Sequence, residues 1–194
     1  MKEANPVKLT RRRGQPSRAD ASQWVLAAMD ILAAHGVDAL RVEQLAKSLG
    51  VTKGSFYWHF RDRDAFLEAI LDTWRRRATL QIIDRLEQSG QSPKDRLAAL
   101  LSLPYAGTKA EQAASVELAI RLWARTDARA LRALAEVDTL RLRYFAQLFG
   151  AMGMTEQDAG IKSVVAYSYM RVAPSLPDYN AETSLVAMLD LLMP

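Results

Sequence analysis

The sequence predicts an all-α protein. Apolar residues recur at spacings of three and four along most of the 194-residue chain. Glycines, prolines and capping residues divide this pattern into segments, and no segment shows the sustained alternation of a β-strand. We expect about nine helices, organised as a basic arm (1–19), a small helical domain (20–66) and a larger helical domain (67–194).

The composition is typical of a globular protein, with 49% hydrophobic and 25% charged residues. The chain has no cysteine, which excludes disulfides and thiolate metal sites. With His35 and His59 as its two histidines, we expect no metal site and no cofactor. No apolar run is long enough to cross a bilayer, and the basic N-terminus lacks the apolar core of a secretory signal. We therefore expect a cytoplasmic protein.

The positive charge is concentrated in the first third of the chain. Residues 1–63 hold eleven Lys/Arg and six Asp/Glu, a net charge of +5, whereas residues 64–194 have a net charge of −1. This distribution favours contact with phosphates at the N-terminal end. The arginine-rich residues 1–19 either lie along DNA phosphates or a minor groove, or form a solubilising tail.

The N-terminal helices form a recognisable pattern. A first helix runs from about Asp20 to Gly36, with Trp24 expected in the core. Residues 42–49 predict a second helix that ends at Gly50, where glycine tolerates a positive φ. Thr52 is the expected N-cap of a third helix that reaches Phe60, its hydroxyl accepting a backbone N–H. This is the spacing of a helix-turn-helix.

The third helix carries unusual surface chemistry. Phe56 and Phe60 share one buried face, while the rest of the helix presents polar and aromatic side chains outward: Lys53, Ser55, Tyr57, Trp58 and His59. The alternative is an ordinary buried helical hairpin, but such hairpins seldom combine these residue types on one short helix. We therefore interpret this face as a binding surface.

The remaining helices follow from capping signals. Asp62 begins a long helix to about Gln88, and Ser92 with Pro93 begins one that stops near Pro104. Thr108 and Glu111 predict a capping box for a helix through Trp123. The next helix runs from Thr126 or Asp127 to the segment 150–153. The last two cover about 155–173 and 180–192, with Asn180 as the cap of the final one.

Residues 21–75 resemble the N-terminal domain of the TetR (tetracycline repressor-like) transcriptional regulators. The motif that carries the resemblance is LAKSLGVTKGSFYWHFRDRDAFLEAIL, from Leu45 to Leu71. The rest of the chain resembles the family in being helical and of similar length. The resemblance implies a three-helix helix-turn-helix DNA-binding domain, followed by a larger helical domain for ligand binding and dimerisation.

The resemblance also implies which residues contact DNA. The helix from Thr52 to Phe60 is expected to lie in a major groove. Contacts to phosphates or to the groove floor are expected from Thr52, Lys53, Tyr57 and His59. Close approach to base edges is expected from Gly54, Ser55 and Trp58. Trp58 is bulkier than usual and either stacks on DNA or packs on the protein. Arg41 replaces the usual Ser or Thr cap, which weakens the cap but adds a possible DNA contact.

For the larger domain, the resemblance implies a homodimer and a small-molecule pocket. The last two helices are expected to form a four-helix interface with a second chain, and two-fold symmetry then requires a palindromic operator. The pocket candidates are aromatic or polar residues on otherwise apolar helices: Trp74, Tyr105, Glu117, Arg121, Trp123, Phe145, Phe149, Tyr167 and Met170. Each of these can equally be core, and Arg121 either recognises an anion or pairs with Glu117 four residues before it.

These features predict a ligand-responsive repressor that a small-molecule inducer releases from its operator. An alternative is an activator or DNA-binding protein of the same fold without a small ligand. An enzyme is disfavoured because the sequence contains no nucleophile elbow, phosphate loop, dinucleotide fingerprint or metal-ligand cluster. A helical protein-binding adaptor would leave the basic N-terminal third unexplained. The sequence does not indicate the operator or the effector.

Overall fold

The computed structural model describes residues 19–176 and 181–193, and every regular element among them is helical. The α-helices are α1 (Ala21–His35), α2 (Val42–Ser48), α3 (Lys53–Phe56), α4 (Arg63–Arg75), α5 (Gln81–Glu87), α6 (Pro93–Ser102), α7 (Thr108–Trp123), α8 (Ala128–Ala151), α9 (Glu156–Val172) and α10 (Ala181–Leu192). Short 3-10 segments follow α1, α6 and α9. A π-helical segment, η2 (Arg76–Leu80), joins α4 to α5. These three form one continuous helix, so the described residues contain nine helices, as predicted.

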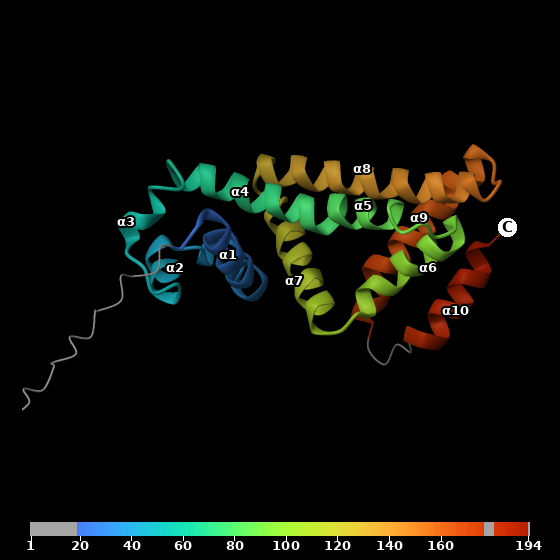
Figure 1. Cartoon of the computed structure of the whole chain (residues 1–194), viewed down its shortest axis with the longest axis horizontal. Helices are drawn as coiled ribbons and strands as arrows, with labels where there is room; N and C mark the ends of the chain where they lie inside the picture. The colour runs from blue at the N-terminus through green and yellow to red at the C-terminus, as the bar shows by residue number, and fades with distance from the viewer. Residues whose placement is uncertain (1–18, 177–180, 194) are drawn as a thin grey trace, which may run out of the picture.

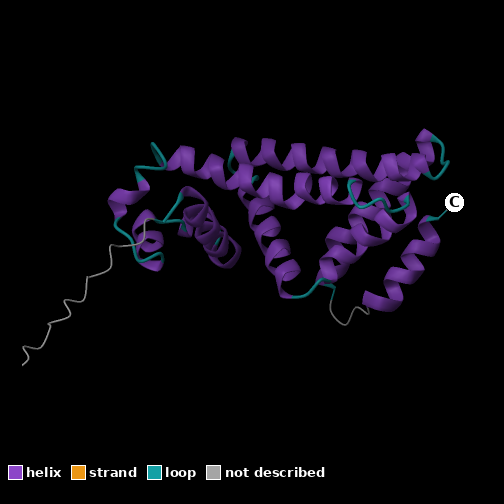
Figure 2. Cartoon of the chain, viewed as in Figure 1, coloured by secondary structure: helices purple, strands orange, loops and turns teal. Residues whose placement is uncertain are grey.

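The molecule is elongated, with α1, α2 and α3 at one end and α10 at the other (Figure 1). The continuous helix α4–η2–α5 runs along the long axis beside α8, and α9 packs against α8 (Figure 2). α7 connects the two ends, because it contacts α1 on one side and α8 on the other. The fold is therefore an N-terminal helix-turn-helix unit joined to a larger helical body by one long helix.

Helix capping explains most of the boundaries. Asp20 accepts from the backbone N–H of Gln23 (2.9 Å), and the Gln23 side chain accepts from the backbone N–H of Asp20, which completes a capping box. Asp62 accepts from the N–H of Ala65 (2.8 Å) at the start of α4. Ser92 and Thr155 cap α6 and α9 in the same way.

The capping box predicted at Thr108 was wrong, and the predicted N-cap Thr52 lacks its side-chain bond. At α7 the N-cap is Gly107 (φ +76°), and Thr108 is already helical, because the left-handed glycine reverses the chain one residue earlier than the capping box required. At α3 Thr52 holds the N-cap position, but no described N–H is bonded to its hydroxyl. Instead the Thr52 carbonyl accepts from the backbone N–H and the hydroxyl of Ser55 (3.0 and 2.8 Å). Residues 1–18 and Asn180 lie outside the described residues.

The apolar interior is divided into two cores. The first core joins the helix-turn-helix unit to α4, α7 and the beginning of α8, and includes Trp24, Trp74 and Trp123. The second core lies among α5, α6, the end of α8, α9 and α10. The first core thus extends across the boundary expected between residues 66 and 67. Within the described residues, no helix combines the length and apolar character needed to cross a bilayer.

Candidate functional site

The helix-turn-helix is built by one tight turn between α2 and α3. Gly50 adopts φ +67°, a conformation that side-chain-bearing residues rarely adopt. The N–H of Val51 then donates to the carbonyl of Ala46 (3.0 Å), which folds the chain back over α2. The regular part of α3 is shorter than predicted and ends at Phe56, after which residues 57–59 form a turn.

Aromatic packing fixes the position of α3. Phe56 and Phe60 are buried, as predicted, with ring centroids 5.2 Å apart. Phe56 also makes edge contacts with Trp24 of α1 (5.3 Å) and Phe66 of α4 (5.1 Å). Such ring pairs contribute about 0.5–1.5 kcal/mol each beyond their buried area. The opposite face of α3 is thereby held outward on a rigid base.

That outward face carries the residues that the sequence singled out. Tyr57 and Trp58 are 54% and 69% exposed, which is unusual for aromatic side chains of this size. Thr52, Lys53, Gly54 and His59 are also exposed, and Ser55 is half-buried. Trp58 also makes an interaction within the protein, so its stacking on DNA and its packing on the protein's own surface both stay predictions. Helix α3 and the turn after it therefore present a mixed polar and aromatic surface.

Two of these side chains also have partners within the protein. Lys53 forms an ion pair with Glu43 of α2, and both side chains are largely exposed. The His59 ring nitrogen Nε2 lies 2.8 Å from the carbonyl oxygen of Ala19, just before α1. His59 thus helps to fix the chain where the basic N-terminal residues leave the domain. An exposed ion pair is worth little, so Lys53 remains available to an external anion.

Neither the glycine at position 54 nor the arginine at position 41 is explained by local packing or helix capping. A Cβ built on Gly54 would meet the Thr52 hydroxyl oxygen at an ordinary 3.8 Å, so the domain tolerates a side chain there. Arg41 is the exposed N-cap residue of α2, and it forms no side-chain capping bond with the described residues. Both observations favour an external requirement at these positions, such as a closely approaching phosphate backbone.

The structure separates the predicted pocket residues into groups. Trp74 and Trp123 lie in the first core, while Phe145, Phe149 and Met170 lie in the second, and Tyr105 is in the 3-10 segment after α6. Glu117, Arg121 and Tyr167 come together between the two cores. An open groove of about 530 Å³ lies elsewhere, between the α4–η2 segment and α8. Its lining contains none of the predicted pocket residues.

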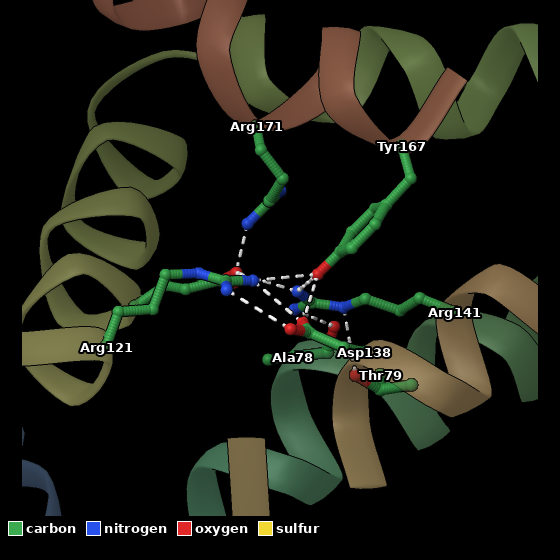
Figure 3. Close-up of polar contacts among 8 residues, drawn as sticks. Ala78, Thr79, Arg121, Asp138, Arg141, Tyr167 and Arg171 are labelled. Atoms are coloured by element: carbon green, nitrogen blue, oxygen red, sulfur yellow. Dashed lines mark hydrogen bonds and ion pairs between the residues drawn. The ribbon is translucent and has the colours of Figure 1, made fainter. Parts of the chain in front are cut away.

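Glu117, Arg121 and Tyr167 belong to a buried polar cluster contributed by four elements (Figure 3). We define the polar cluster as Thr79 of η2, Glu117 and Arg121 of α7, Asp138 and Arg141 of α8, and Tyr167 and Arg171 of α9. The Glu117 carboxylate accepts from Arg121 (3.0 Å) and Arg141 (2.8 Å) and pairs with Arg171. The pairing of Arg121 with Glu117 was one of the two predicted alternatives for Arg121.

Asp138 and Tyr167 complete the connections within the polar cluster. Arg121 binds Asp138 through both terminal nitrogens (3.1 and 2.7 Å), and the Tyr167 hydroxyl donates to Asp138 (2.6 Å). The guanidinium carbons of Arg141 and Arg171 both lie 5.8 Å from the centre of the Tyr167 ring, within cation–π range. Three helices are therefore joined through charged groups at one point.

Arg141 connects the polar cluster to the π-helical segment. Its Nε donates to the Thr79 hydroxyl (3.2 Å), and its Nη2 donates to the carbonyl of Ala78 (3.1 Å). A π-helical turn weakens the regular backbone ladder, and such turns are frequent at functional sites. Along the continuous helix α4–η2–α5, Thr79 of the polar cluster lies between Trp74 of the first core and Leu86 of the second. Along α8, Asp138 and Arg141 lie between Val137 of the first core and Tyr144 of the second.

The charges of the polar cluster stabilise each other. Burial by itself raises the pKa of Glu117, but Arg141, Arg171 and Arg121 outweigh it and lower this pKa to about 2. Burial lowers the pKa of Arg141, and Glu117 with Tyr167 more than compensates, so its net pKa is raised. Burial raises the pKa of Tyr167. Glu117 is therefore ionised throughout the physiological range despite being 4% exposed.

Sequence reasoning missed Thr79, Asp138, Arg141 and Arg171. The sequence contained one signal, the spacing of opposite charges on predicted helices. Asp138 and Arg141 are three residues apart, and Glu117 and Arg121 are four apart, so each pair shares one helical face. The partners come from helices far apart in the chain, which spacing cannot reveal. Elsewhere, the described residues contain no group of three or more His, Cys, Asp or Glu placed to hold a metal ion.

Comparison with known proteins identifies the N-terminal unit. Residues 25–70 match the family model described as "Bacterial regulatory proteins, tetR family". Residues 25–70 are therefore similar to the N-terminal domain of that family. The tetracycline repressor protein class A from transposon 1721 of Escherichia coli is 44% identical over 48 residues, which cover 25% of this chain and 22% of that protein. The chain matches about a fifth of the length of that repressor and of the HTH-type transcriptional regulator SrpR from Pseudomonas putida.

Solved structures extend the likeness to the whole fold. A transcriptional regulator from Saccharomonospora viridis in complex with choline has a TM-score of 0.72 at 16% identity, covering 89% of this chain and 94% of its own. The regulator FadR from Bacillus subtilis in complex with stearoyl-CoA has a TM-score of 0.65 at 16% identity, covering 89% and 97%. The chain thus shares its overall fold with these solved structures.

Proposed function

We propose that this protein is a homodimeric repressor that a small-molecule inducer releases from a palindromic operator. The observation that carries the proposal is the exposed face of α3 in a domain that matches the TetR family at residues 25–70. In this proposal residues 20–66 bind DNA and residues 67–194 bind the ligand and dimerise. Because the target is genomic DNA, we also propose a cytoplasmic location.

The proposed DNA contacts are those named from the sequence. Thr52, Lys53, Tyr57 and His59 contact phosphates or the groove floor, and the His59 ring also bonds the carbonyl of Ala19. Gly54, Ser55 and Trp58 approach the bases, and an exposed aromatic ring can contact a thymine methyl group. Arg41 adds a further phosphate contact from the start of α2.

Dimerisation is proposed through α9 and α10. Exposed apolar side chains follow one face of α9 at Ile161, Val164 and Val165, and Val186 and Leu191 are exposed on α10. A row of apolar residues of this kind is suited to a two-fold helical interface, in which the same face meets its own copy. Two recognition helices would then meet two half-sites about one helical turn apart.

Regulation requires that the inducer bind the DNA-free state more tightly than the DNA-bound state. A 100-fold loss of operator affinity needs about 2.7 kcal/mol of coupling. Two solved structures with this fold are complexes with stearoyl-CoA and with choline, which supports a ligand in the larger domain. The alternative is an activator or a DNA-binding protein of the same fold without a small ligand.

Selection from random-sequence DNA at near-physiological salt tests the proposal, because non-specific binding is weak there. We expect enrichment of a two-fold symmetric motif, which then serves as the probe for inducers. Folded dimer that enriches no motif, with or without candidate ligands, would contradict the regulator proposal. Enrichment without any ligand response would instead favour the same-fold alternative.

A further inference from the structure

The polar cluster contains more positive than negative charge. Arg121, Arg141 and Arg171 face two carboxylates, Glu117 and Asp138, so the group carries one unbalanced positive charge. Charge that is partly removed from water and not fully paired is costly. One further negative group at this point would therefore stabilise the polar cluster by balancing its charge.

The unmet demand can be assigned to particular donors. Every nitrogen of Arg141 is engaged, because they donate to Thr79, Ala78, Glu117 and Tyr167. Arg171 differs, since its buried Nε has no hydrogen-bond partner among the described residues. A buried donor left without an acceptor is rare in folded proteins. The hydrogen-bond donor of the polar cluster that lacks an acceptor is thus the Nε–H of Arg171.

Two arginines of the polar cluster are partly exposed to solvent. The side chains of Arg121 and Arg171 are 33% and 26% exposed, whereas that of Glu117 is 6% exposed. These two arginines approach from α7 and α9 (Figure 3), and both pair with the Glu117 carboxylate. Planar guanidinium groups so placed match the oxygens of a carboxylate or phosphate.

We infer that the polar cluster is the binding site of a small anionic effector, whose carboxylate or phosphate group is held by Arg171 and Arg121. This inference rests on the proposed function, since it names the chemical class of the inducer. The Arg171 Nε–H is covered in the free protein, so the guanidinium must turn for the anion to take it and neutralise the surplus charge. Because Arg141 links the same carboxylate to the π-helical segment, binding acts at the joint between the two cores.

Thermal unfolding of the DNA-free protein with simple anions tests the inference. The probes are benzoate, inorganic phosphate and the neutral analogue benzyl alcohol, all at constant ionic strength. At a concentration a hundredfold above Kd, an anion that fits should raise Tm by roughly 5–10 °C. Benzyl alcohol should not. Comparing benzoate with phosphate distinguishes a carboxylate site from a phosphate site.

Variants locate the effect. Arg171→Gln and Arg121→Gln should abolish the anion-dependent rise in Tm. Arg96→Gln should keep it, because Arg96 is a similarly covered arginine paired with Glu87 on a different face. Glu117→Gln removes the competing internal carboxylate and should strengthen anion binding about tenfold. A rise that persists in both Arg171→Gln and Arg121→Gln places the anion elsewhere and overturns the inference.

A second measurement keeps the test decisive if a variant does not fold. In wild-type protein with 15N-labelled arginine, the Nε–H resonance of Arg171 should shift on titration with whichever anion raises Tm. No shift with either anion, in protein that is folded, overturns the inference. A different result would contradict the proposed function. If an anion binds to the polar cluster but does not change operator affinity, the binding site is supported and its regulatory role is not.

Discussion

Glu117 shows how a buried carboxylate is kept charged by its neighbours. Its pKa of about 2 in the folded protein lies below its ordinary value of 4.5 because three arginines surround it. A depressed pKa contributes stability above the unfolded pKa, and this stability is lost as the pH falls toward the folded pKa. The shift corresponds to about 3 kcal/mol, lost between about pH 4.5 and pH 2.

Glu117→Gln should therefore flatten the acid limb of the stability curve. We expect the variant to be less stable than wild type at pH 7 and to lose less stability between pH 4.5 and pH 3. Urea unfolding at a series of pH values measures both effects. Glu136→Gln is the control, because Glu136 pairs with Arg75 at the surface and should change stability by less than about 1 kcal/mol. Equal acid limbs for Glu117→Gln and wild type would show that the arginines do not stabilise this carboxylate.

Gly54 allows DNA contact to be separated from stability. The domain has room for a methyl group there, and alanine is favoured over glycine in helices by up to about 1 kcal/mol. Gly54→Ala should thus leave Tm unchanged or higher, while operator affinity falls roughly tenfold, or about 1.4 kcal/mol, because the added methyl keeps α3 from the DNA.

Gly150→Ala is the matched control, since Gly150 lies at the end of α8 with open space around it. It should change neither operator affinity nor Tm by much. Fluorescence anisotropy with the selected operator measures affinity, and calorimetry measures Tm. Full affinity in Gly54→Ala would remove this position from the DNA interface.

At the scale of elements, α2 is a helix with an unfavourable cap. Arg41 holds the N-cap position without a capping bond to the described residues, whereas Asp62 caps α4. Arg41→Ser should stabilise the domain by about 1 kcal/mol and raise Tm by roughly 2–4 °C. If Arg41 contacts a phosphate, the same change should weaken DNA binding, and the salt dependence should become shallower by about one unit per lost contact.

Arg125→Ser removes the same charge from the exposed connection between α7 and α8 and serves as the control. It should alter neither operator affinity nor its salt dependence. Titration at several salt concentrations, together with thermal unfolding, tests both arms. Stabilisation without weaker DNA binding would mean that Arg41 is merely a poor cap.

The helices could be predicted because their signals are local. Gly50, Asp62, Ser92 and Thr155 each act within four residues, and the structure confirms the boundary that each one sets. The exposed face of α3 could also be predicted, because one turn of helix places its side chains. Thr108 failed for a local reason as well, since a left-handed conformation at the preceding glycine is not visible in a capping pattern.

The polar cluster could not be assembled from the sequence. The pair Glu117 and Arg121 lies within one helical turn, so its contact was foreseen as an alternative. Arg141 and Arg171 reach the same carboxylate from α8 and α9, and their arrival depends on how three helices cross. The π-helical segment that receives Arg141 has no signature in the composition of residues 76–80. The way the helices cross in the tertiary structure, rather than the periodicity of the sequence, determines which residues meet at such a site.

At the scale of the whole molecule, the proposed function depends on whether two copies associate through α9 and α10. Val164 is 54% exposed in the middle of the apolar face of α9. Placing a carboxylate there, as in Val164→Glu, should prevent association, because an unpaired charge is costly to bury in an interface. Sedimentation velocity should then show a monomer where wild type sediments as a dimer.

Leu118→Glu places the same charge on an equally exposed leucine of α7, outside this face, and should leave the dimer intact. DNA binding should follow the oligomeric state. A dimer binds its second half-site intramolecularly, so its loss should cost a factor of about 10²–10⁴ in operator affinity. The monomeric Val164→Glu protein should still bind one half-site weakly, because Val164 lies in α9 and outside the helix-turn-helix unit. A dimeric Val164→Glu protein would move the interface elsewhere, and a monomeric wild type would rule out the two-fold arrangement.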